Sequence, residues 1–266
     1  GNANINIGYH AGCHNHNAVC NIAIGQYAGK MNGTGDHNVY LGTDAGRGST
    51  SGTPATDNTG SKNVFLGFEA GYYLTTGSSN VAIGCRAGCG ITTGESNVLL
   101  GRLAGRSTTT GGGNVFLGPD TGREATTQSN NVFIGDKAGQ YRNGGGRNIA
   151  LGYYALYGSS TPANNTGFYN IAFGALAGKN VTSGSYNVFF GRQTGCVTTT
   201  GAHNFAVGCN ALYGNVTGAG NIALGSGAMT SIGAGNCNVF IGKDAGASSG
   251  TATDNDASFN TAVGFE

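Results

Sequence analysis

The sequence repeats one five-residue pattern, Asn-apolar-x-apolar-Gly, fifteen times, and most copies begin seventeen residues after the previous one. The first copy begins at Asn4 and the last at Asn260. Two apolar residues separated by one lie on the same face of a β-strand, and Asn and Gly favour the turns that bound a strand. Seventeen residues are too few for a strand and a crossover helix. The pattern therefore predicts an all-β, parallel β-solenoid of about fifteen 17-residue coils, each stacked on the next.

Composition does not change along the repeats, so residues 1–266 are predicted to form a single repeat domain. Three intervals are longer than seventeen residues and predict loop insertions near 50–60, 159–167 and 249–257, all at the same turn of the coil. Their oxygen-rich side chains suggest Ca²⁺, but the middle loop has no carboxylate, which favours ordinary polar turns. The residues predicted for these surface loops are Asp57, Asn58, Asn164, Asn165, Asp254 and Asn255.

The third position of the pentad points away from the second and fourth, and in a solitary solenoid it would face water. It is instead apolar in almost every copy, and a strand that is apolar on both faces is buried on both faces. We infer a homo-oligomer about the solenoid axis, with three chains favoured. The competing interpretation is that position 3 faces a second layer of its own coil. The predicted oligomer interface comprises Tyr40, Phe65, Leu99, Phe116, Phe133, Phe189 and Phe240.

The polar positions of the repeat predict structural columns along the stack. Asn at position 1 predicts a ladder of side-chain amides that bond to the copies above and below. Gly at position 5 predicts a positive φ, or a corner where a Cβ would strike the next coil. Thr-Thr-Gly at positions 13 to 15 is typical of a turn. An ice-binding face and a strip for O-glycosylation are the alternatives for these threonines.

Composition excludes several classes of protein. Only 9% of the residues are charged and the net charge is +1, so no basic surface for nucleic acid is expected. Gly and Asn interrupt every apolar run, so no membrane span is expected. The seven cysteines are interpreted as unpaired small apolar residues, with Cys85–Cys89 and Cys196–Cys209 as the nearest candidate pairs.

Candidate chemistry is sparse. His10, Cys13, His14, His16 and Cys20 crowd together but fit no zinc-binding spacing, so no metal site is predicted. The twelve carboxylates are scattered, and no nucleophile, phosphate loop or paired carboxylate is recognised. The sequence predicts no catalytic residue and no cofactor, and the protein is not expected to be an enzyme.

The pentads at 21–28 and 80–87, Asn-Ile-Ala-Ile-Gly-x-x-Ala and Asn-Val-Ala-Ile-Gly-x-x-Ala, resemble the head repeats of YadA-type trimeric autotransporter adhesins. Residues 260–264, Asn-Thr-Ala-Val-Gly, are also similar to repeat arrays of phage tail fibres. The resemblance covers essentially all fifteen copies. It implies a left-handed parallel β-roll, usually trimeric, whose work is adhesion or receptor contact, and it supplies no catalytic residues.

These observations predict a structural protein that forms an extracellular fibre or filament by stacking and side-by-side packing of solenoid subunits. One alternative is a trimeric adhesin head or phage tail-fibre shaft that binds a glycan or protein of a host surface. A second alternative is an ice-binding solenoid. The expected partner is the chain itself, with a surface glycan or protein as a further one. The expected location is extracellular, on a cell surface or on a virion.

Overall fold

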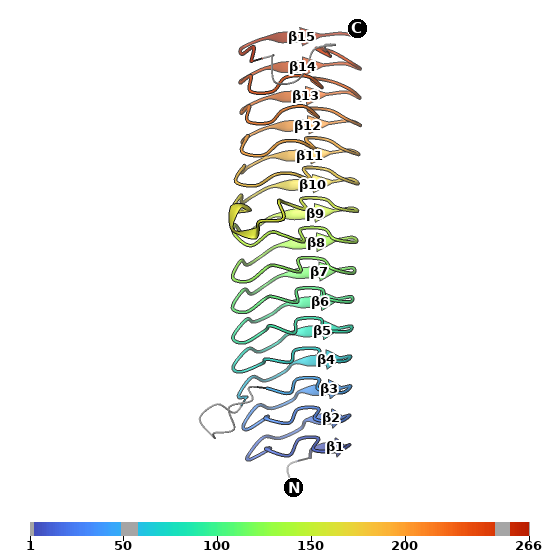
Figure 1. Cartoon of the computed structure of the whole chain (residues 1–266), viewed down its shortest axis with the longest axis vertical. Coiled ribbons are helices and arrows are strands. Elements are labelled where there is room, and N and C mark those ends of the chain that lie inside the picture. Colours follow the sequence, from blue (N-terminus) through green and yellow to red (C-terminus); the bar gives the residue numbers. More distant parts are fainter. Residues whose placement is uncertain (1–2, 49–57, 248–255, 266) are drawn as a thin grey trace. The chain divides into compact units, whose positions relative to one another are not determined.

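The computed structural model describes residues 3–48, 58–247 and 256–265. Its contacts divide the chain into two compact units, Gly1–Asn131 and Val132–Glu266. Each unit consists of three-residue strands, one in each repeat, joined by turns (Figure 1). The predicted parallel β-solenoid with coils of about seventeen residues is therefore confirmed. The single repeat domain over 1–266 stays a prediction.

The first unit contains seven described strands, and each coil is named below after its strand. Successive strands pair in parallel, with each pentad position opposite the same position of the next copy, as in Val64↔Val81. The 25-residue interval does not shift this register, because Val39 still lies opposite Val64. The strands are β1 (Ile5–Ile7), β2 (Ile22–Ile24), β3 (Val39–Leu41), β4 (Val64–Leu66), β5 (Val81–Ile83), β6 (Val98–Leu100) and β7 (Val115–Leu117).

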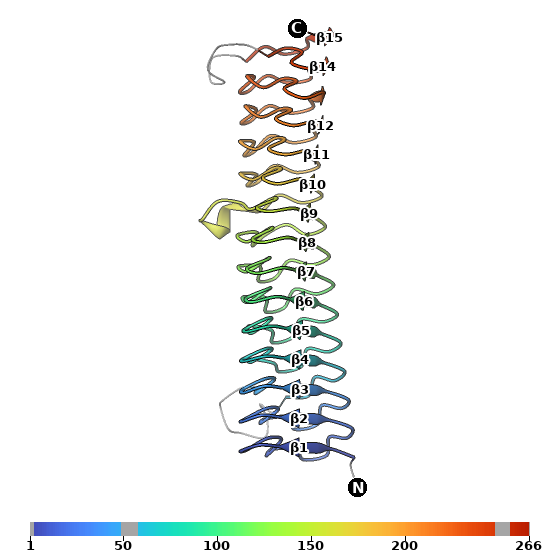
Figure 2. The same cartoon turned by 90° about the vertical axis from the view of Figure 1, so that its right-hand side faces the viewer.

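The second unit contains eight described strands with the same parallel register. A short 3₁₀ helix, η2 (Pro162–Asn164), occupies the insertion between β9 and β10 and projects from the side of the coils in both views (Figure 1, Figure 2). The strands are β8 (Val132–Ile134), β9 (Ile149–Leu151), β10 (Ile171–Phe173), β11 (Val188–Phe190), β12 (Phe205–Val207), β13 (Ile222–Leu224), β14 (Val239–Ile241) and β15 (Thr261–Val263).

Position 3 of the pentad fills the interior of each coil. The prediction that these residues form an oligomer interface is wrong, and the competing interpretation, in which they face their own coil, is correct. The interior is narrow: a Cβ added at Gly71, on the opposite wall, would lie 2.2 Å from the ring of Phe65. One large side chain therefore spans the coil. The misassigned residues are Tyr40, Phe65, Leu99, Phe116, Phe133 and Phe189, all with 0% exposure, and Phe240 with 7%.

The predicted asparagine ladder is confirmed. The backbone N–H of Asn97 and its side-chain Nδ2 both donate to Oδ1 of Asn80 in the preceding coil, each at 3.0 Å. The same Nδ2 also donates to the carbonyl oxygen of Gly111 at 2.9 Å. Asn97 is completely buried, so the ladder satisfies polar groups that water cannot reach. It thereby fixes each coil on its neighbour.

The glycine at position 5 has the predicted positive φ, between +122° and +143° in every copy. A Cβ added at Gly84 would also lie 2.7 Å from the carbonyl oxygen of Gly101 in the next coil. Both predicted causes therefore apply, because the position combines a left-handed backbone with close approach of the adjacent coil.

Candidate functional site

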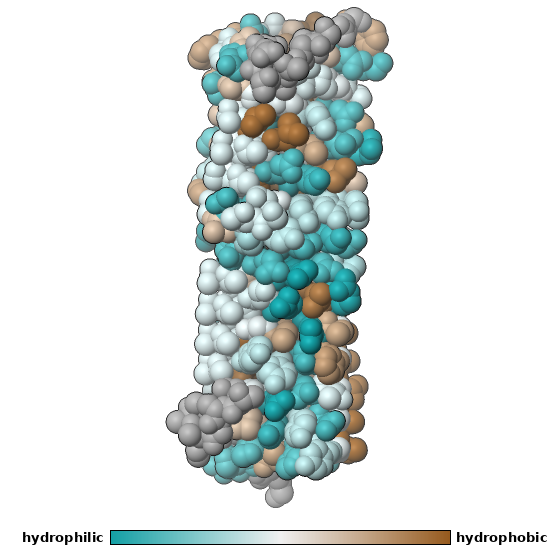
Figure 3. Space-filling view, viewed as in Figure 1, coloured by the Kyte–Doolittle hydropathy of each residue, from teal (hydrophilic) through white to brown (hydrophobic). Residues whose placement is uncertain are grey.

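The outward side of the strands is an uninterrupted apolar surface in each unit. Positions 2 and 4 of the pentad point out of the coil there. Several of their side chains are substantially exposed, including Leu41 at 42%, Ile83 at 39% and Leu151 at 41%. Brown, apolar residues line the right-hand edge beside β1 to β5 in Figure 3. We call the two columns of positions 2 and 4 the sheet face.

The sheet face carries no charged residue in either unit. In the first unit it comprises Ile5, Ile7, Ile22, Ile24, Val39, Leu41, Val64, Leu66, Val81, Ile83, Val98, Leu100, Val115 and Leu117. In the second unit it comprises Val132, Ile134, Ile149, Leu151, Ile171, Phe173, Val188, Phe190, Phe205, Val207, Ile222, Leu224, Val239, Ile241, Thr261 and Val263. Thr261 is the one polar member.

The size of the sheet face follows from strand geometry. With strands about 4.8 Å apart and a width of about 13 Å from position 1 to position 5, seven strands give a strip of roughly 400 Å². The eight strands of the second unit give slightly more. An apolar patch of this size is within the range of the largest patch on a typical soluble monomer, and such patches are often functional.

Exposed aromatic side chains extend the sheet face on its flanks. At position 6, which follows the strand, Tyr9, Phe68 and Tyr153 are 63%, 44% and 52% exposed. Before the strands of the second unit, the ring of Tyr186 stacks on that of Tyr169, with 5.2 Å between their centroids. His203 stacks on the other face of Tyr186 at 4.9 Å. These rings widen the apolar surface in both units.

The predicted surface-loop residues fall into three groups. Asn164 lies in η2 and is exposed, as predicted. Asn58 and Asn165 are completely buried, so their assignment to the surface is wrong. Asp57, Asp254 and Asn255 lie outside the described residues.

The two buried asparagines close the bases of their insertions. Nδ2 of Asn165 donates to the carbonyl oxygens of Tyr141 and Ser159, both at 2.8 Å. Nδ2 of Asn58 donates to Tyr40 Oη at 3.2 Å, and Asn58 Oδ1 accepts from the N–H of Gly60. Where the chain leaves and rejoins the coil, backbone groups lose their regular partners, and an internal amide replaces them.

The threonine columns are built into the turn. The hydroxyl of Thr92 donates to the carbonyl oxygen of Thr109 at 3.2 Å, and Thr75 bonds in the same way to Thr92. Position 13 therefore contributes a second hydrogen-bonded ladder. Threonines at position 14, such as Thr76 and Thr93, are exposed beside it.

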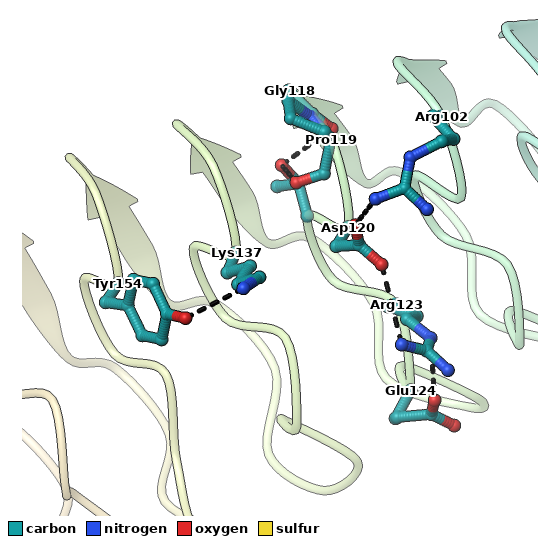
Figure 4. A network of polar contacts seen from close by, with 9 residues as sticks. Arg102, Gly118, Pro119, Asp120, Arg123, Glu124, Lys137 and Tyr154 are labelled. Atoms are coloured by element: carbon teal, nitrogen blue, oxygen red, sulfur yellow. Dashed lines mark hydrogen bonds and ion pairs between the residues drawn. The ribbon is translucent and has the colours of Figure 1, made fainter.

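Charged side chains form short networks where they occupy position 7 and its neighbours (Figure 4). In the first unit, Asp120 accepts from Arg102 of the preceding coil and pairs with Arg123 of its own coil at 3.5 Å. Arg123 also contacts Glu124 at 3.2 Å. In the second unit, Lys137 donates to Tyr154 Oη at 2.8 Å. Arg102 with Asp120, and Lys137 with Tyr154, thus link neighbouring coils just beyond the end of the strands.

The cysteine and histidine residues form no recognisable chemical centre. All seven cysteines are free thiols. Burial raises the pKa of the half-buried Cys89 thiol to about 11. Among the described residues, no group of three His, Cys, Asp or Glu side chains is placed to hold a metal ion. The same residues contain no helix that is long and apolar enough to cross a membrane.

Comparisons with protein-family models, with curated proteins and with solved structures gave no match. The resemblance to adhesin and tail-fibre repeats therefore stays a prediction from the repeat motif.

Proposed function

We propose that this protein is a structural β-solenoid whose copies pack side by side through their sheet faces and form an extracellular fibre or filament. The single observation that supports this most is the pair of apolar columns at positions 2 and 4. Burial of such surface is the main favourable contribution to protein association. The proposed interface therefore consists of positions 2 and 4 of the pentad, on the outward side of the strands, and not of position 3, which was predicted from the sequence.

The period of the sheet face favours a second copy of this chain as the partner. Apolar side chains recur every 4.8 Å or so along the columns, because that is the spacing of stacked strands. A second sheet face has the same period and the same lack of charge. Two sheets pack about 10 Å apart with their side chains interdigitated, as in a β-sandwich.

Each unit offers its own strip of the sheet face, of roughly 400 Å² in the first unit and slightly more in the second. Two strips that cover each other remove roughly 800 Å² of surface from water, so each unit contributes separately to the association. A pair of copies is the smallest assembly in which both faces are covered, and two-fold pairs are the commonest oligomers. Stacking of the coils end to end, left-handed winding and an extracellular, cell-surface or virion location belong to the same proposal.

Sedimentation velocity of the wild type and of Ile83→Lys/Leu117→Lys tests the proposal. Two ammonium groups on the sheet face would be desolvated on packing, which opposes association. The wild type is expected to sediment as an assembly of at least two copies and the variant as a monomer with an unchanged circular dichroism spectrum. Thr93→Lys/Thr110→Lys adds the same charge at the exposed turn and should keep the assembly. A monomeric wild type, or equal masses for both variants, would refute the proposal.

The alternative of an adhesin or tail-fibre shaft that binds a surface glycan or protein uses the same fold. A groove of about 610 Å³ over the coils of β4 to β7 is the observation that favours it. Ice binding has less support, because the position-13 hydroxyls donate to backbone carbonyls instead of facing water.

A further inference from the structure

The first unit has a groove of about 610 Å³ that runs over the coils of β4 to β7. Its walls include Glu69, Tyr72, Tyr73, Arg86 and Arg106. These residues occupy positions 7 to 11 of their repeats, so the groove lies beyond the turn that follows the strand and is separate from the sheet face. Its volume is within the range of about 300 to 1,000 Å³ that is typical of small-molecule sites.

The groove exists because positions 10 and 11 change in size from coil to coil. The β4 coil carries two tyrosines there, whereas the next coil carries Cys89 and Gly90. A Cβ at Gly90 would lie 2.7 Å from the carbonyl oxygen of Arg106, so the backbone of the adjacent coil requires the glycine. Ser107 continues the hollow, and its hydroxyl donates to Glu124 at 3.2 Å. The hollow is thus built into the stacking of the coils.

An aromatic ring stands at one end of the groove. Tyr73 is 52% exposed and contacts the ring of Tyr72 edge to face, with 4.7 Å between the centroids. Tyr72 thereby supports one edge of the Tyr73 ring, and much of the Tyr73 ring stays accessible to a ligand. An aromatic face carries partial negative charge and attracts the polarised C–H groups on the flat side of a pyranose ring.

Charged groups line the side of the groove. Nε of Arg86 donates to Oε2 of Glu69 at 2.5 Å, which neutralises both charges and leaves other carboxylate lone pairs free to accept hydroxyl groups. Arg106 is exposed and forms no ion pair within the described part of the chain. The groove therefore contains one uncompensated positive charge. A guanidinium group binds a carboxylate with two parallel hydrogen bonds.

We propose that this groove binds a short acidic oligosaccharide, with a sugar ring against Tyr73 and a sugar carboxylate on Arg106. Glu69 and Arg86 supply an acceptor and donors for hydroxyl groups at the side. The walls are polar and open, which suits a hydroxyl-rich ligand better than an apolar one. The inference does not depend on self-association, because none of these residues belongs to the sheet face.

Isothermal titration calorimetry with trigalacturonate tests the proposal, and its neutral trimethyl ester is the matched ligand control. The wild type is expected to bind the acid and to bind the ester about tenfold more weakly, because the ester loses a charge-assisted pair. Raising the salt concentration should weaken binding of the acid alone. Equal affinity for the two ligands would overturn the role of the carboxylate, and no binding of either would overturn the site.

Two substitutions assign the binding to the groove. Arg106→Gln should weaken binding of trigalacturonate about tenfold, and Tyr73→Ala should do so by a similar or larger factor. Both side chains are exposed, so circular dichroism should be unchanged. Arg192→Gln and Tyr153→Ala change exposed residues of the same types in the second unit and should bind as the wild type does. Wild-type affinity in the two groove variants would show that the site lies elsewhere.

Alkylation of the wild type provides a second, local readout. Cys89 lines the groove, whereas Cys85, four residues earlier, is exposed outside its lining. Bound trigalacturonate should slow the reaction of a maleimide with Cys89 several-fold and leave Cys85 unaffected, as measured on peptides by mass spectrometry. Equal protection of both thiols, or protection of neither, would contradict the placement of the ligand.

Discussion

The two sides of each strand use similar residues for different purposes. In β11 (Val188–Phe190), Phe189 is completely buried inside the coil, whereas its neighbour Phe190 points outward on the sheet face. Hydrophobicity alone does not distinguish them. The difference lies in the volume that each side has available, since the inside is closed and the outside is open.

The closed interior limits the side-chain volume that positions 3 and 9 of one coil can hold together. Coils with an aromatic residue at position 3 have glycine at position 9, as in Phe116 with Gly122. Three coils of the second unit reverse the sizes and pair alanine at position 3 with a large residue at position 9. These pairs are Ala150 with Leu156, Ala206 with Leu212 and Ala223 with Met229, and all six side chains are buried. Dense packing explains why no described coil is large at both of these positions, whereas coils that are small at both, such as Ala82 with Gly88, bury a further apolar residue, here Ile91.

The large residues at position 9 adopt a strained backbone conformation. Leu156, Leu212 and Met229 have φ values of +45°, +54° and +57°, in the left-handed region where Cβ lies too close to the following carbonyl oxygen. Burial of a leucine or methionine side chain, at about 1.5 to 3 kcal/mol, offsets a strain of about 1 to 2 kcal/mol. The outward columns show no such compensation between positions. Size exchange across the coil, and not apolar character, therefore marks the inward side.

The largest expected loss of stability comes from removing the side chain that fills the interior of one coil. Phe116→Ala removes a completely buried ring opposite a glycine, so the cavity has no neighbour that can fill it. We expect a loss of about 3 to 5 kcal/mol in the free energy of unfolding, measured by urea denaturation. Val115→Ala, on the outward side of the same strand, should cost well under half of that. Similar losses for the two variants would contradict the assignment of inside and outside.

A second substitution on the opposite wall sharpens the same comparison. Gly122 has a φ of +54°, close to the values at Leu156 and Leu212, so a leucine is tolerated there to the same extent. Phe116→Ala/Gly122→Leu reproduces the native pair Ala150 with Leu156 and should recover at least half of the lost free energy. Gly122→Leu alone should destabilise, because the coil then holds two large side chains. Failure of the double variant to recover any stability would argue against exchange of volume between positions 3 and 9.

The asparagine ladder gives the next largest effect. Asn97→Ala leaves the N–H of Asn114 and the carbonyl oxygen of Gly111 without the partners that Asn97 provides, in a site that excludes water. We expect a loss of about 2 to 4 kcal/mol in urea denaturation, since each orphaned buried group costs about 1 to 3 kcal/mol. Thr110→Ala, which changes an exposed residue of the same coil, serves as the control. An equal, small effect in both would mean that the ladder does not stabilise the stack.

Much of the fold could be predicted from sequence because the repeat defines it. The strands, their parallel register, the ladder that includes Asn80 and Asn97, and the glycine at position 5 all follow from a period of seventeen and from local chemistry. The alternation of side chains along a strand also predicted correctly that position 3 points away from positions 2 and 4. This alternation could not show which face of the strand points into the coil, because both faces are apolar.

The sequence did contain a signal for the inward side that alternation misses. The pairing of Ala150 with Leu156, and of Phe133 with Gly139, indicates a shared enclosed space, but only when positions 3 and 9 are compared. The burial of Asn58 and Asn165 and the groove at Gly90 could not be predicted in this way. They depend on how neighbouring coils meet at an insertion or at a change in side-chain size.

A smaller effect, and one that depends on pH, is expected at Tyr40. Its ring fills the β3 coil, Asn58 Nδ2 donates to its hydroxyl, and that hydroxyl lies 3.4 Å from Asn32 Oδ1. Tyr40→Phe should therefore cost about 1 kcal/mol at pH 7. Burial raises the pKa of Tyr40 above its ordinary value of 10.0.

The sign of the pH dependence follows from that direction. Above pH 10 the unfolded chain releases the Tyr40 proton while the folded chain retains it, so the wild type loses stability that Tyr40→Phe does not lose. The difference between the two proteins should be constant up to about pH 9 and should narrow as the pH rises through 10 to 11 in urea denaturation. Tyr213→Phe, which changes an exposed tyrosine, provides the control. A difference that is constant with pH would mean that Tyr40 ionises in the folded protein.

The smallest effect in a solitary chain is expected on the sheet face, and there it should depend on protein concentration. Val98 is half-buried in one copy, so Val98→Thr adds a hydroxyl that water can still reach and should cost less than about 1 kcal/mol. If a second copy covers the face, the hydroxyl loses water on association, and assembly ceases to stabilise the variant as strongly as the wild type. The loss should then grow between about 1 and about 100 µM protein, because mass action favours the assembly.

Phe116→Ala, whose cavity lies inside one copy, should show a loss of stability that is independent of protein concentration. Concentration dependence thus separates the outward side of the strands from the inward side, and its absence for Val98→Thr would mean that the sheet face stays open to solvent.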